Sequence, residues 1–365
     1  MAFWATRQGP RDDKVKGGGP GDRRADKGSV IRPFLKWAGG KRQLLPALRL
    51  HYPSSFDRYI EPFLGSGAVF FDLCGTGRLA GRRVELHDLN PDLIGCYLAV
   101  RDRTERVITA LDDLAAEHEA RGADCYYDVR DRRFNPARKA GGAERPYTPE
   151  LAAMFIYLNR TGFNGLYRLN RDGEFNVPAG RYENPRICDA EHLRTVAKAL
   201  RARGVLIERR PFDDALKRAG AGDFVYCDPP YAPLSATSQF AHYTAGGFSS
   251  LDQIRLHQAV VDAAARGATV VLSNSSAPQI AAAYTGYAAR RSGLRVARVP
   301  ARRAINSRAA SRGPIDELII SNARGAAGPL RGTGEAAGPL RGTRPTEIKL
   351  AMAKISATRR RTRTA

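Results

Sequence analysis

The chain has 365 residues, of which 59 are Lys or Arg and 37 are Asp or Glu, so its formal net charge is +22. Its hydrophobic content of 43% predicts a globular protein, and no apolar run reaches the roughly 18 residues that a membrane-spanning helix needs. The five cysteines contain no Cys-x-x-Cys pair and the six histidines no paired spacing. This pattern argues against a disulfide framework and predicts a cytoplasmic protein without a bound metal.

The positive charge is not confined to the two ends of the chain. Residues 1–30 carry a net charge of +3 and residues 323–365 carry +8, which leaves +11 for residues 31–322. A folded core with this excess predicts a polyanionic partner, most simply nucleic acid. A codon bias toward Arg, Ala and Gly is the alternative source of the charge.

Both ends of the chain have a low-complexity composition. Residues 1–30 are rich in Gly, Arg and Asp, which predicts a disordered basic arm. Residues 326–333 recur unchanged at 336–343. Two repeats rich in Gly and Pro cannot bury a core, so we expect residues 323–365 to form a basic low-complexity tail.

Between these ends, short β-prone runs alternate with helical patterns. The expected strands are 58–62, 83–88, 205–209, 223–228, 268–274, 293–299 and 316–321. A helix is expected over 252–265, with its apolar face formed by Ile254, Val260, Val261 and Ala264. The alternation predicts a Rossmann-like, doubly wound α/β sheet built from residues 31–90 and 189–322.

Residues 91–188 interrupt this alternation. Apolar residues recur at helical spacing over 104–120, and Thr148 followed by Pro149 is typical of a helix start. We therefore expect a mainly helical domain inserted between strands of the sheet. Within it, Asp172-Gly173 predicts a β-hairpin at about residues 162–182.

The segment Ile60–Gly67 reads Ile-Glu-Pro-Phe-Leu-Gly-Ser-Gly, a strand followed by a glycine turn that opens a helix. Such glycines let the backbone approach a ligand at the end of a strand. About twenty residues later a second strand ends at Asp88, where a carboxylate can accept hydrogen bonds from ribose hydroxyls. We expect four residues of the turn to contact the same ligand: Glu61, Phe63, Gly65 and Gly67.

The glycine pattern favours S-adenosylmethionine over a nicotinamide or flavin dinucleotide, because Phe70 stands where a dinucleotide motif has its third glycine. Upstream, Pro33–Lys41 is only superficially similar to a phosphate loop, since Arg42 replaces the Ser or Thr of that motif. Trp37 is expected to cover the adenine or methionine end of the cofactor, and Lys41 to neutralise its carboxylate. A tryptophan packed in the core is the alternative.

Residues 226–231 read Tyr-Cys-Asp-Pro-Pro-Tyr and predict the catalytic site. The strand ends at Asp228 because Pro229 and Pro230 cannot continue the hydrogen-bond ladder. Asp228 and the Pro229 carbonyl can accept hydrogen bonds from an exocyclic amine, while Tyr231 can stack on the ring that carries it. Both adenine and cytosine have such an amine, so these residues leave the base open.

A basic loop precedes Ile315. It contains Arg302, Arg303, Arg308 and Arg312. We expect phosphate contacts there, which give affinity without sequence information. A merely solvated charged loop is the alternative.

Taken in this order, the motifs resemble the Dam family of DNA adenine methyltransferases over residues 31–322. The longest matching segments are Leu158–Pro178 and Gly180–Tyr182, followed by Tyr226–Tyr231. The resemblance implies an S-adenosylmethionine-dependent enzyme that methylates an adenine flipped out of duplex DNA. It also implies Gly-Ala-Thr-Cys as the target sequence.

By the same resemblance, S-adenosylmethionine is bound by Trp37, Lys41, Asp88 and Asp228. Guanine reading falls to Arg168 on the hairpin and to Lys36, which matches the position that reads the first guanine. Phe163 stands where the family has an aromatic wedge, and Asn164 where a side chain contacts the DNA backbone. The expected recognition surface also includes Leu166, Asn170, Arg181 and Tyr182.

Three other functions stay open on the residues alone. These are a methyltransferase acting on the cytosine amine, a silent DNA-binding relative, and a dinucleotide oxidoreductase. For the preferred function we expect double-stranded DNA as the partner, a monomeric and nucleoid-associated protein, and possible pairing with a restriction endonuclease.

Overall fold

The computed structural model describes residues 31–37, 41–141, 147–232, 248–302 and 314–323. They belong to one compact unit that begins at Ile31. The predicted arm over 1–30, the repeats of the tail and the basic loop after Arg302 lie outside the described residues.

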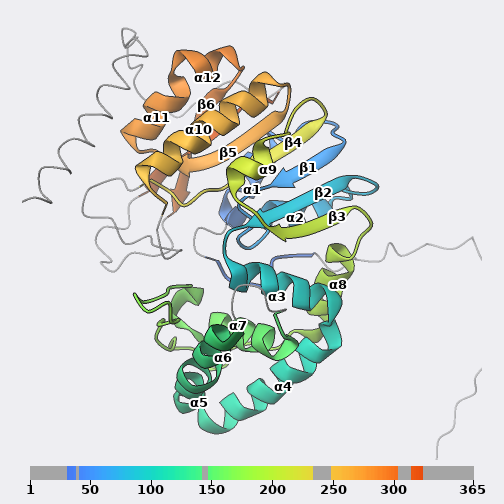
Figure 1. Cartoon of the computed structure of the whole chain (residues 1–365), viewed down its shortest axis with the longest axis vertical. Coiled ribbons are helices and arrows are strands. Elements are labelled where there is room, and N and C mark those ends of the chain that lie inside the picture. Colours follow the sequence, from blue (N-terminus) through green and yellow to red (C-terminus); the bar gives the residue numbers. More distant parts are fainter. Residues whose placement is uncertain (1–30, 38–40, 142–146, 233–247, 303–313, 324–365) are drawn as a thin grey trace, which may run out of the picture. The chain divides into compact units, whose positions relative to one another are not determined.

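Seven strands form one sheet with the order β3-β2-β1-β4-β5-β7-β6 (Figure 1). The strands are β1 (Arg58–Glu61), β2 (Arg83–Asp88), β3 (Val205–Arg209), β4 (Asp223–Cys227), β5 (Thr269–Ser275), β6 (Arg295–Arg302) and β7 (Pro314–Ser321). The first five are parallel and β7 runs antiparallel to both β5 and β6. The Rossmann-like α/β prediction is confirmed, and all seven strands form where expected to within three residues.

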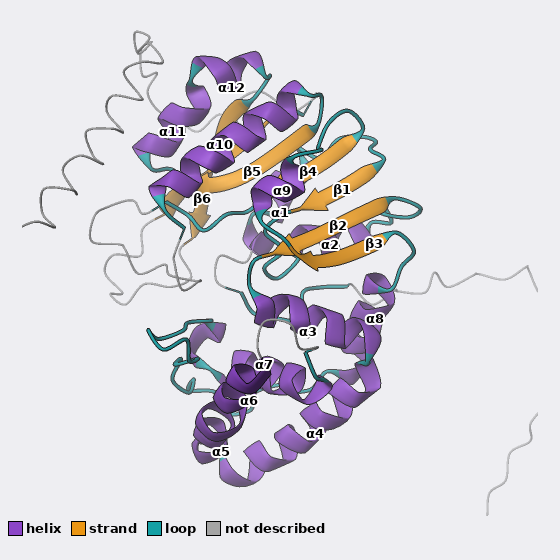
Figure 2. Cartoon of the chain, viewed as in Figure 1, coloured by secondary structure: helices purple, strands orange, loops and turns teal. Residues whose placement is uncertain are grey.

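Helices cover both faces of the sheet, as Figure 2 shows. Neighbouring residues of a strand join different core clusters, since Tyr59 packs with Phe70 of α2 whereas Ile60 packs with Val260 of α10. Because both faces of the sheet are covered at its centre, β4 is buried at every position and is apolar after Asp223. The flanking helices are η1 (Lys41–Gln43), α1 (Leu45–Arg49), α2 (Ala68–Gly75), α8 (Ala190–Leu200), α9 (Phe212–Leu216), α10 (Ser250–Ala265), α11 (Pro278–Thr285) and α12 (Tyr287–Arg291).

The predicted apolar face of α10 is partly wrong. Val260, Val261 and Ala264 are buried, but Ile254 is 39% exposed. At 3.6 residues per turn, Ile254 lies roughly 160° around the helix from the buried Leu256. The expected helix itself is present, and it begins two residues earlier than predicted behind a capping box.

The segment between β2 and β3 is mainly helical (Figure 1). Thr148 accepts a hydrogen bond from the Leu151 N–H and so caps the helix that begins at Pro149, as the sequence predicts. No helix in the described part of the chain is long and apolar enough to cross a membrane. Besides α8, the helices of this segment are α3 (Pro91–Asp102), α4 (Thr104–Arg121), α5 (Ala123–Asp128), the π-helix η2 (Val129–Phe134), α6 (Asn135–Gly141), α7 (Pro149–Thr161) and η3 (Phe163–Gly165).

The turn of the expected hairpin forms at Gly173, whose φ of 75° suits a glycine. The two flanking runs pair only through isolated antiparallel bridges, Leu169 with Phe175 and Gly162 with Ala179. Backbone hydrogen bonds such as Asn170 N–H to the Glu174 carbonyl, at 2.8 Å, cross between the two runs. A side chain of α6 adds to this pairing, because the Asn135 amide bonds to both the N–H and the C=O of Phe175. The hairpin is therefore held by side chains of the helices as well as by its own sparse backbone pairing.

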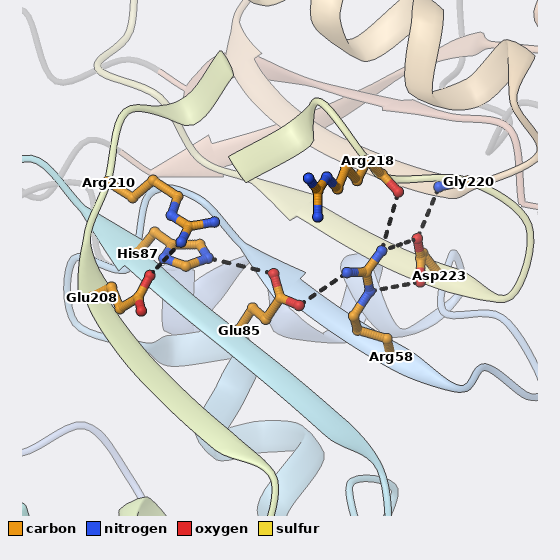
Figure 3. A network of polar contacts seen from close by, with 8 residues as sticks. All are labelled: Arg58, Glu85, His87, Glu208, Arg210, Arg218, Gly220 and Asp223. Carbon is orange, nitrogen blue, oxygen red and sulfur yellow. Dashed lines mark hydrogen bonds and ion pairs between the residues drawn. The ribbon is translucent and has the colours of Figure 1, made fainter. Parts of the chain in front are cut away.

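A polar network ties the first residues of β1 and β4 together (Figure 3). The Arg58 guanidinium donates to both carboxylate oxygens of Asp223, at 2.9 and 2.7 Å, and to Glu85 at 2.9 Å. The Arg218 carbonyl accepts a further bond from Arg58. These contacts stabilise the register of β1, β2 and β4 at the end of the sheet opposite the carboxyl ends of those strands.

Candidate active site

The carboxyl ends of β1, β2 and β4 meet at a cavity of about 580 Å³. The strand order reverses between β1 and β4, and ligands of open α/β sheets bind at such a switch point. Ten predicted site residues line the cavity together: Trp37, Lys41, Glu61, Phe63, Gly65, Asp88, Asp228, Pro229, Pro230 and Tyr231. Two motifs more than a hundred residues apart in the sequence thus share one site.

The Asp88 carboxylate joins the glycine turn to the start of α3. Its oxygens accept the Gly65 N–H at 3.1 Å and the Asn90 N–H at 2.9 Å. Burial raises the pKa of Asp88, while these backbone donors act in the opposite direction. Gly65 has a φ of 47°, and a Cβ built there would lie 3.0 Å from the Trp37 ring. The turn therefore requires glycine at this position.

Gly67 is the one predicted cofactor residue that does not line the cavity. Its φ is 66°, and a Cβ there would meet Tyr97, Phe71 and Leu64 at 3.1 to 3.3 Å. Close packing beneath the turn accounts for this glycine.

Trp37 lines the cavity and also packs against the inserted domain. Its ring stacks on Tyr167 with centroids 5.7 Å apart and an interplanar angle of 24°. Phe155 of α7 lies 6.5 Å away. The cavity-lining and core-packing interpretations of this tryptophan therefore both apply.

Asp228 follows directly after β4 and is paired with a cation. Lys41 Nζ lies 2.9 Å from Asp228 Oδ1, and Ser273 Oγ donates to the same oxygen at 3.0 Å. Lys41 is only 5% exposed and Asp228 is 21% exposed. Burial raises the pKa of Asp228, and the Lys41 ammonium and the Ser273 hydroxyl oppose this change.

The rest of the Asp228–Tyr231 turn is supported by side chains that the sequence reasoning missed. The Tyr231 hydroxyl donates to Glu317 at 2.7 Å, and the Pro230 carbonyl accepts a bond from Gln253 at 3.1 Å. Gln253 in turn accepts a bond from Asn274. The polar run Ser-Asn-Ser at the end of the otherwise apolar β5 was the sequence signal for this support.

An aromatic cluster forms one wall of the cavity. Phe63 stacks on Phe212 at 5.4 Å and 24°, and Phe248 lies 5.8 Å from both. The sequence reasoning missed Phe212 and Phe248. Phe212 could have been found because it follows β3, at the same edge of the sheet as Asp88.

A second cavity, of about 480 Å³, is basic and lies in the inserted segment. It brings together Lys36, Arg181 and Tyr182, which the sequence assigned to DNA, with Arg160 and Arg186. Lys36 Nζ lies 4.2 Å from the Tyr182 ring centroid and donates to the Arg160 carbonyl. Glu183 also lines the cavity and Arg186 is paired with Asp189, but the four cations outnumber these acids, which suits an anion or the acceptor edge of a base.

The remaining predicted DNA contacts differ in their surroundings. Phe163 is 47% exposed, and Asn164 has a left-handed φ of 55°, which costs free energy in a non-glycine residue. Arg168 is exposed and its Nε donates to the Asn176 side chain at 2.7 Å. The Asn170 side chain is engaged within the turn, where it accepts two backbone N–H groups and donates to Glu174.

Leu166, beside these residues, is half-buried. Of Arg302 only the backbone at the end of β6 is described, and Arg303 lies outside the described residues. Within the ranges that the structure covers, no three His, Cys, Asp or Glu side chains are grouped to hold a metal.

Comparison with known proteins identifies the family. The family model of the D12 class N6 adenine-specific DNA methyltransferases matches residues 37–297. The type II methyltransferase M1.LlaDCHI of Lactococcus lactis subsp. cremoris is 38% identical over 293 residues, which cover 80% of this chain and 95% of that protein. The type II methyltransferase M.MjaIII of Methanocaldococcus jannaschii is 38% identical over 303 residues, with coverages of 80% and 99%.

The DNA adenine methylase of Escherichia coli (strain K12) is 36% identical over 300 residues, which cover 82% of this chain and 98% of that enzyme. These matches identify a methyltransferase rather than a dinucleotide oxidoreductase, and an adenine-specific enzyme rather than one that acts on cytosine. The chain belongs to the D12 class N6 adenine-specific DNA methyltransferases.

Proposed function

We propose that this methyltransferase uses S-adenosylmethionine to methylate N6 of an adenine that is flipped out of duplex DNA, within Gly-Ala-Thr-Cys. The observation that carries the proposal is the meeting of the Asp228–Tyr231 turn and the Gly65–Asp88 pair in one cavity. The target sequence rests on the hairpin residues that match the Dam pattern.

The residues present fit S-adenosylmethionine. The cavity of about 580 Å³ is within the size range of small-molecule sites. Asp88 offers carboxylate oxygens to ribose hydroxyls, and the wall formed by Phe63 and Phe212 offers a face to the adenine ring. Gly65 lets the ligand approach the backbone closely. When bound, S-adenosylmethionine supplies an electrophilic methyl group on a sulfonium.

Asp228 and the Pro229 carbonyl orient the target amine in this proposal. Both accept its N–H hydrogens, so that the nitrogen lone pair is aimed at the methyl group. Lys41 and Ser273 hold the carboxylate in place, and the Glu317 contact fixes the Tyr231 ring on which the flipped base stacks. No general base is needed, because the proton of the amine can leave after transfer.

A flipped base is required because the amine of a stacked adenine cannot enter the cavity. The exposed Phe163 is suited to fill the gap left in the duplex. Arg168 is exposed and can exchange its Asn176 partner for the two acceptors of guanine in the major groove. The basic cavity at Lys36 and Tyr182 would lie against the same duplex.

The test is methyl transfer from labelled S-adenosylmethionine to duplexes that contain Gly-Ala-Thr-Cys or a scrambled version of it. Nucleoside analysis should find label only in N6-methyladenine and only from the first duplex. Equal labelling of both duplexes would keep the chemistry and remove the assigned target. A restriction partner and a monomeric state are further expectations, the second of which sedimentation of the free enzyme would check.

A further inference from the structure

The inner face of the hairpin contacts the cofactor cavity through Tyr167. Arg168 next to it is exposed, whereas Tyr167 is 4% exposed, as alternation along an extended chain requires. The Tyr167 ring stacks on Trp37 at 5.7 Å and packs edge-on against Phe155 at 5.8 Å. One residue of the predicted DNA-reading strand therefore touches a wall of the cavity.

The Tyr167 hydroxyl extends the contact to a second wall. It donates to Asp92 Oδ2 at 2.6 Å, in the first turn of α3. Asp92 and Asn90 lie on the same helix start, where the Asn90 side chain accepts the Asp92 N–H. The Asn90 N–H donates to Asp88, so buried contacts lead from Tyr167 to the carboxylate assigned to ribose.

Arg138 locks the tip of the hairpin to the same point. Its Nε donates to Asp92 at 2.7 Å and its Nη1 donates to the Gly173 carbonyl at 2.7 Å. Asp92 is 6% and Arg138 12% exposed, so solvent screens this pair weakly. A displacement of the hairpin tip would therefore strain the Asp92 end of α3.

Asn159 of α7 makes an independent connection at the base of the hairpin. Its amide bonds to the N–H of Lys36 at 2.8 Å and to the Lys36 carbonyl at 2.6 Å. The same amide donates to the Gly165 carbonyl at 3.2 Å. Lys36 immediately precedes Trp37, so the start of the hairpin and the Trp37 segment are fixed to one side chain.

From these contacts we infer that Tyr167 is a positioning residue, which couples DNA recognition by the hairpin to the affinity of the cofactor cavity. The inference rests on the proposed function. A cognate duplex that binds Arg168 holds the hairpin in one position, and Tyr167 then holds Trp37 and the start of α3 against the cofactor. Such coupling is a free energy shared by two sites, so each ligand tightens the binding of the other.

The experiment measures equilibrium binding of S-adenosylhomocysteine to the full chain. Affinity is determined without DNA, with a saturating Gly-Ala-Thr-Cys duplex and with a scrambled duplex. We expect the cognate duplex to tighten binding by about 5-fold or more over the scrambled duplex, which is the lower end of allosteric couplings. In Tyr167→Phe, which keeps the ring but loses the Asp92 bond, this ratio should fall by at least half.

Tyr167→Leu, which also loses the stack on Trp37, should bring the ratio to about one. The matched control is Tyr127→Phe, since Tyr127 is 40% exposed on α5 and outside both cavities. Its ratio should equal that of the wild type. Each ratio compares two affinities of the same variant, so a general loss of stability affects both and cancels. If Tyr167 had a merely structural role, its substitution would therefore leave the ratio unchanged.

Two results would overturn the inference while leaving the proposed function intact. One is a wild-type enzyme that methylates the cognate duplex but binds S-adenosylhomocysteine equally with either duplex. The other is an unchanged ratio in Tyr167→Phe and Tyr167→Leu. Absence of S-adenosylhomocysteine binding to the wild type would instead overturn the proposed function, and the inference with it.

Discussion

At the scale of single residues, the pair formed by Lys41 and Asp228 sets the electrostatics of the site. Asp228 has its full capacity to accept hydrogen bonds only when it is ionised. Burial disfavours this charged form and raises the pKa of Asp228. Lys41, 2.9 Å away and nearly buried, favours the charge. The lysine is thus suited to keep the Asp228 carboxylate, to which we assign the catalytic role, ionised before any substrate binds.

The substitution Lys41→Met should shift the pH dependence of methylation. Without the ammonium, the pKa of Asp228 rises further, so activity should be lost at a higher pH as the solution is acidified. The acid limb of a kcat/KM profile measures this directly. Lys198→Met, at an exposed position of α8, is the matched control and should keep the wild-type limb. A Lys41→Met limb at the wild-type position would contradict the role of the pair.

At the scale of elements, the hairpin and the ends of the strands have separate tasks. The hairpin has little strand pairing of its own and is held by side chains from α6 and α7. This arrangement leaves Arg168 exposed, as the proposed contact with DNA requires. The sheet, by contrast, is fixed by the Arg58 network at the end remote from the cavity (Figure 3).

Arg168→Gln should lower kcat/KM on Gly-Ala-Thr-Cys more than it lowers kcat/KM on altered sequences, so that discrimination between them decreases. The loss of a bidentate contact to guanine is worth about 1–3 kcal/mol of discrimination at one base pair. Comparing kcat/KM on Gly-Ala-Thr-Cys with duplexes changed at each position measures it. Arg171→Gln, exposed in the same hairpin, should keep the wild-type ratios. Equal discrimination in both variants would remove Arg168 from the reading of guanine.

Arg58→Met should lower the free energy of unfolding without direct contact with the active site. It leaves the largely buried Asp223 carboxylate without its cation, at a cost of roughly 3 kcal/mol. Chemical denaturation measures the change. Arg83→Met replaces the exposed register neighbour of Arg58 on β2 and should stay within about 0.5 kcal/mol of the wild type. Similar stabilities for the two variants would show that the network contributes little.

At the scale of the whole molecule, the sequence was most informative where the fold repeats a simple rule. Buried parallel strands are short apolar runs, and Glu61, Asp88 and Asp228 mark where three of them end at one edge. That rule was enough to predict the sheet, whereas the placement of Asp228 with the cofactor residues came from the resemblance to the Dam family. Helical spacing did not predict the exposure of Ile254, because Ile254 lies only about 20° around the helix from the buried Val261.

Contacts between distant segments could not be derived from the sequence. The Tyr231–Glu317 bond joins residues 86 apart, and the Tyr167–Asp92 bond joins residues 75 apart. The acceptors, Glu317 and Asp92, are residue types that are common on protein surfaces, so nothing in the sequence marks them as partners of a tyrosine. Asn170 shows a related difficulty, because its side-chain amide could bind either DNA or the backbone of the turn. In the structure it accepts hydrogen bonds from N–H groups of the turn. Local pattern indicates the elements, whereas tertiary packing decides these partners.

The central claim is that the Asp228–Tyr231 turn methylates adenine N6 in the cavity shared with Asp88. The most direct measurement is methylation of plasmid DNA by the wild type and by Asp228→Asn, mapped at single-base resolution. The account predicts N6-methyladenine at Gly-Ala-Thr-Cys sites with the wild type. It predicts a rate at least about 100-fold lower with Asp228→Asn, together with retained binding of the plasmid. Methylation by the variant at the wild-type rate, or a methyl group on cytosine, would contradict it.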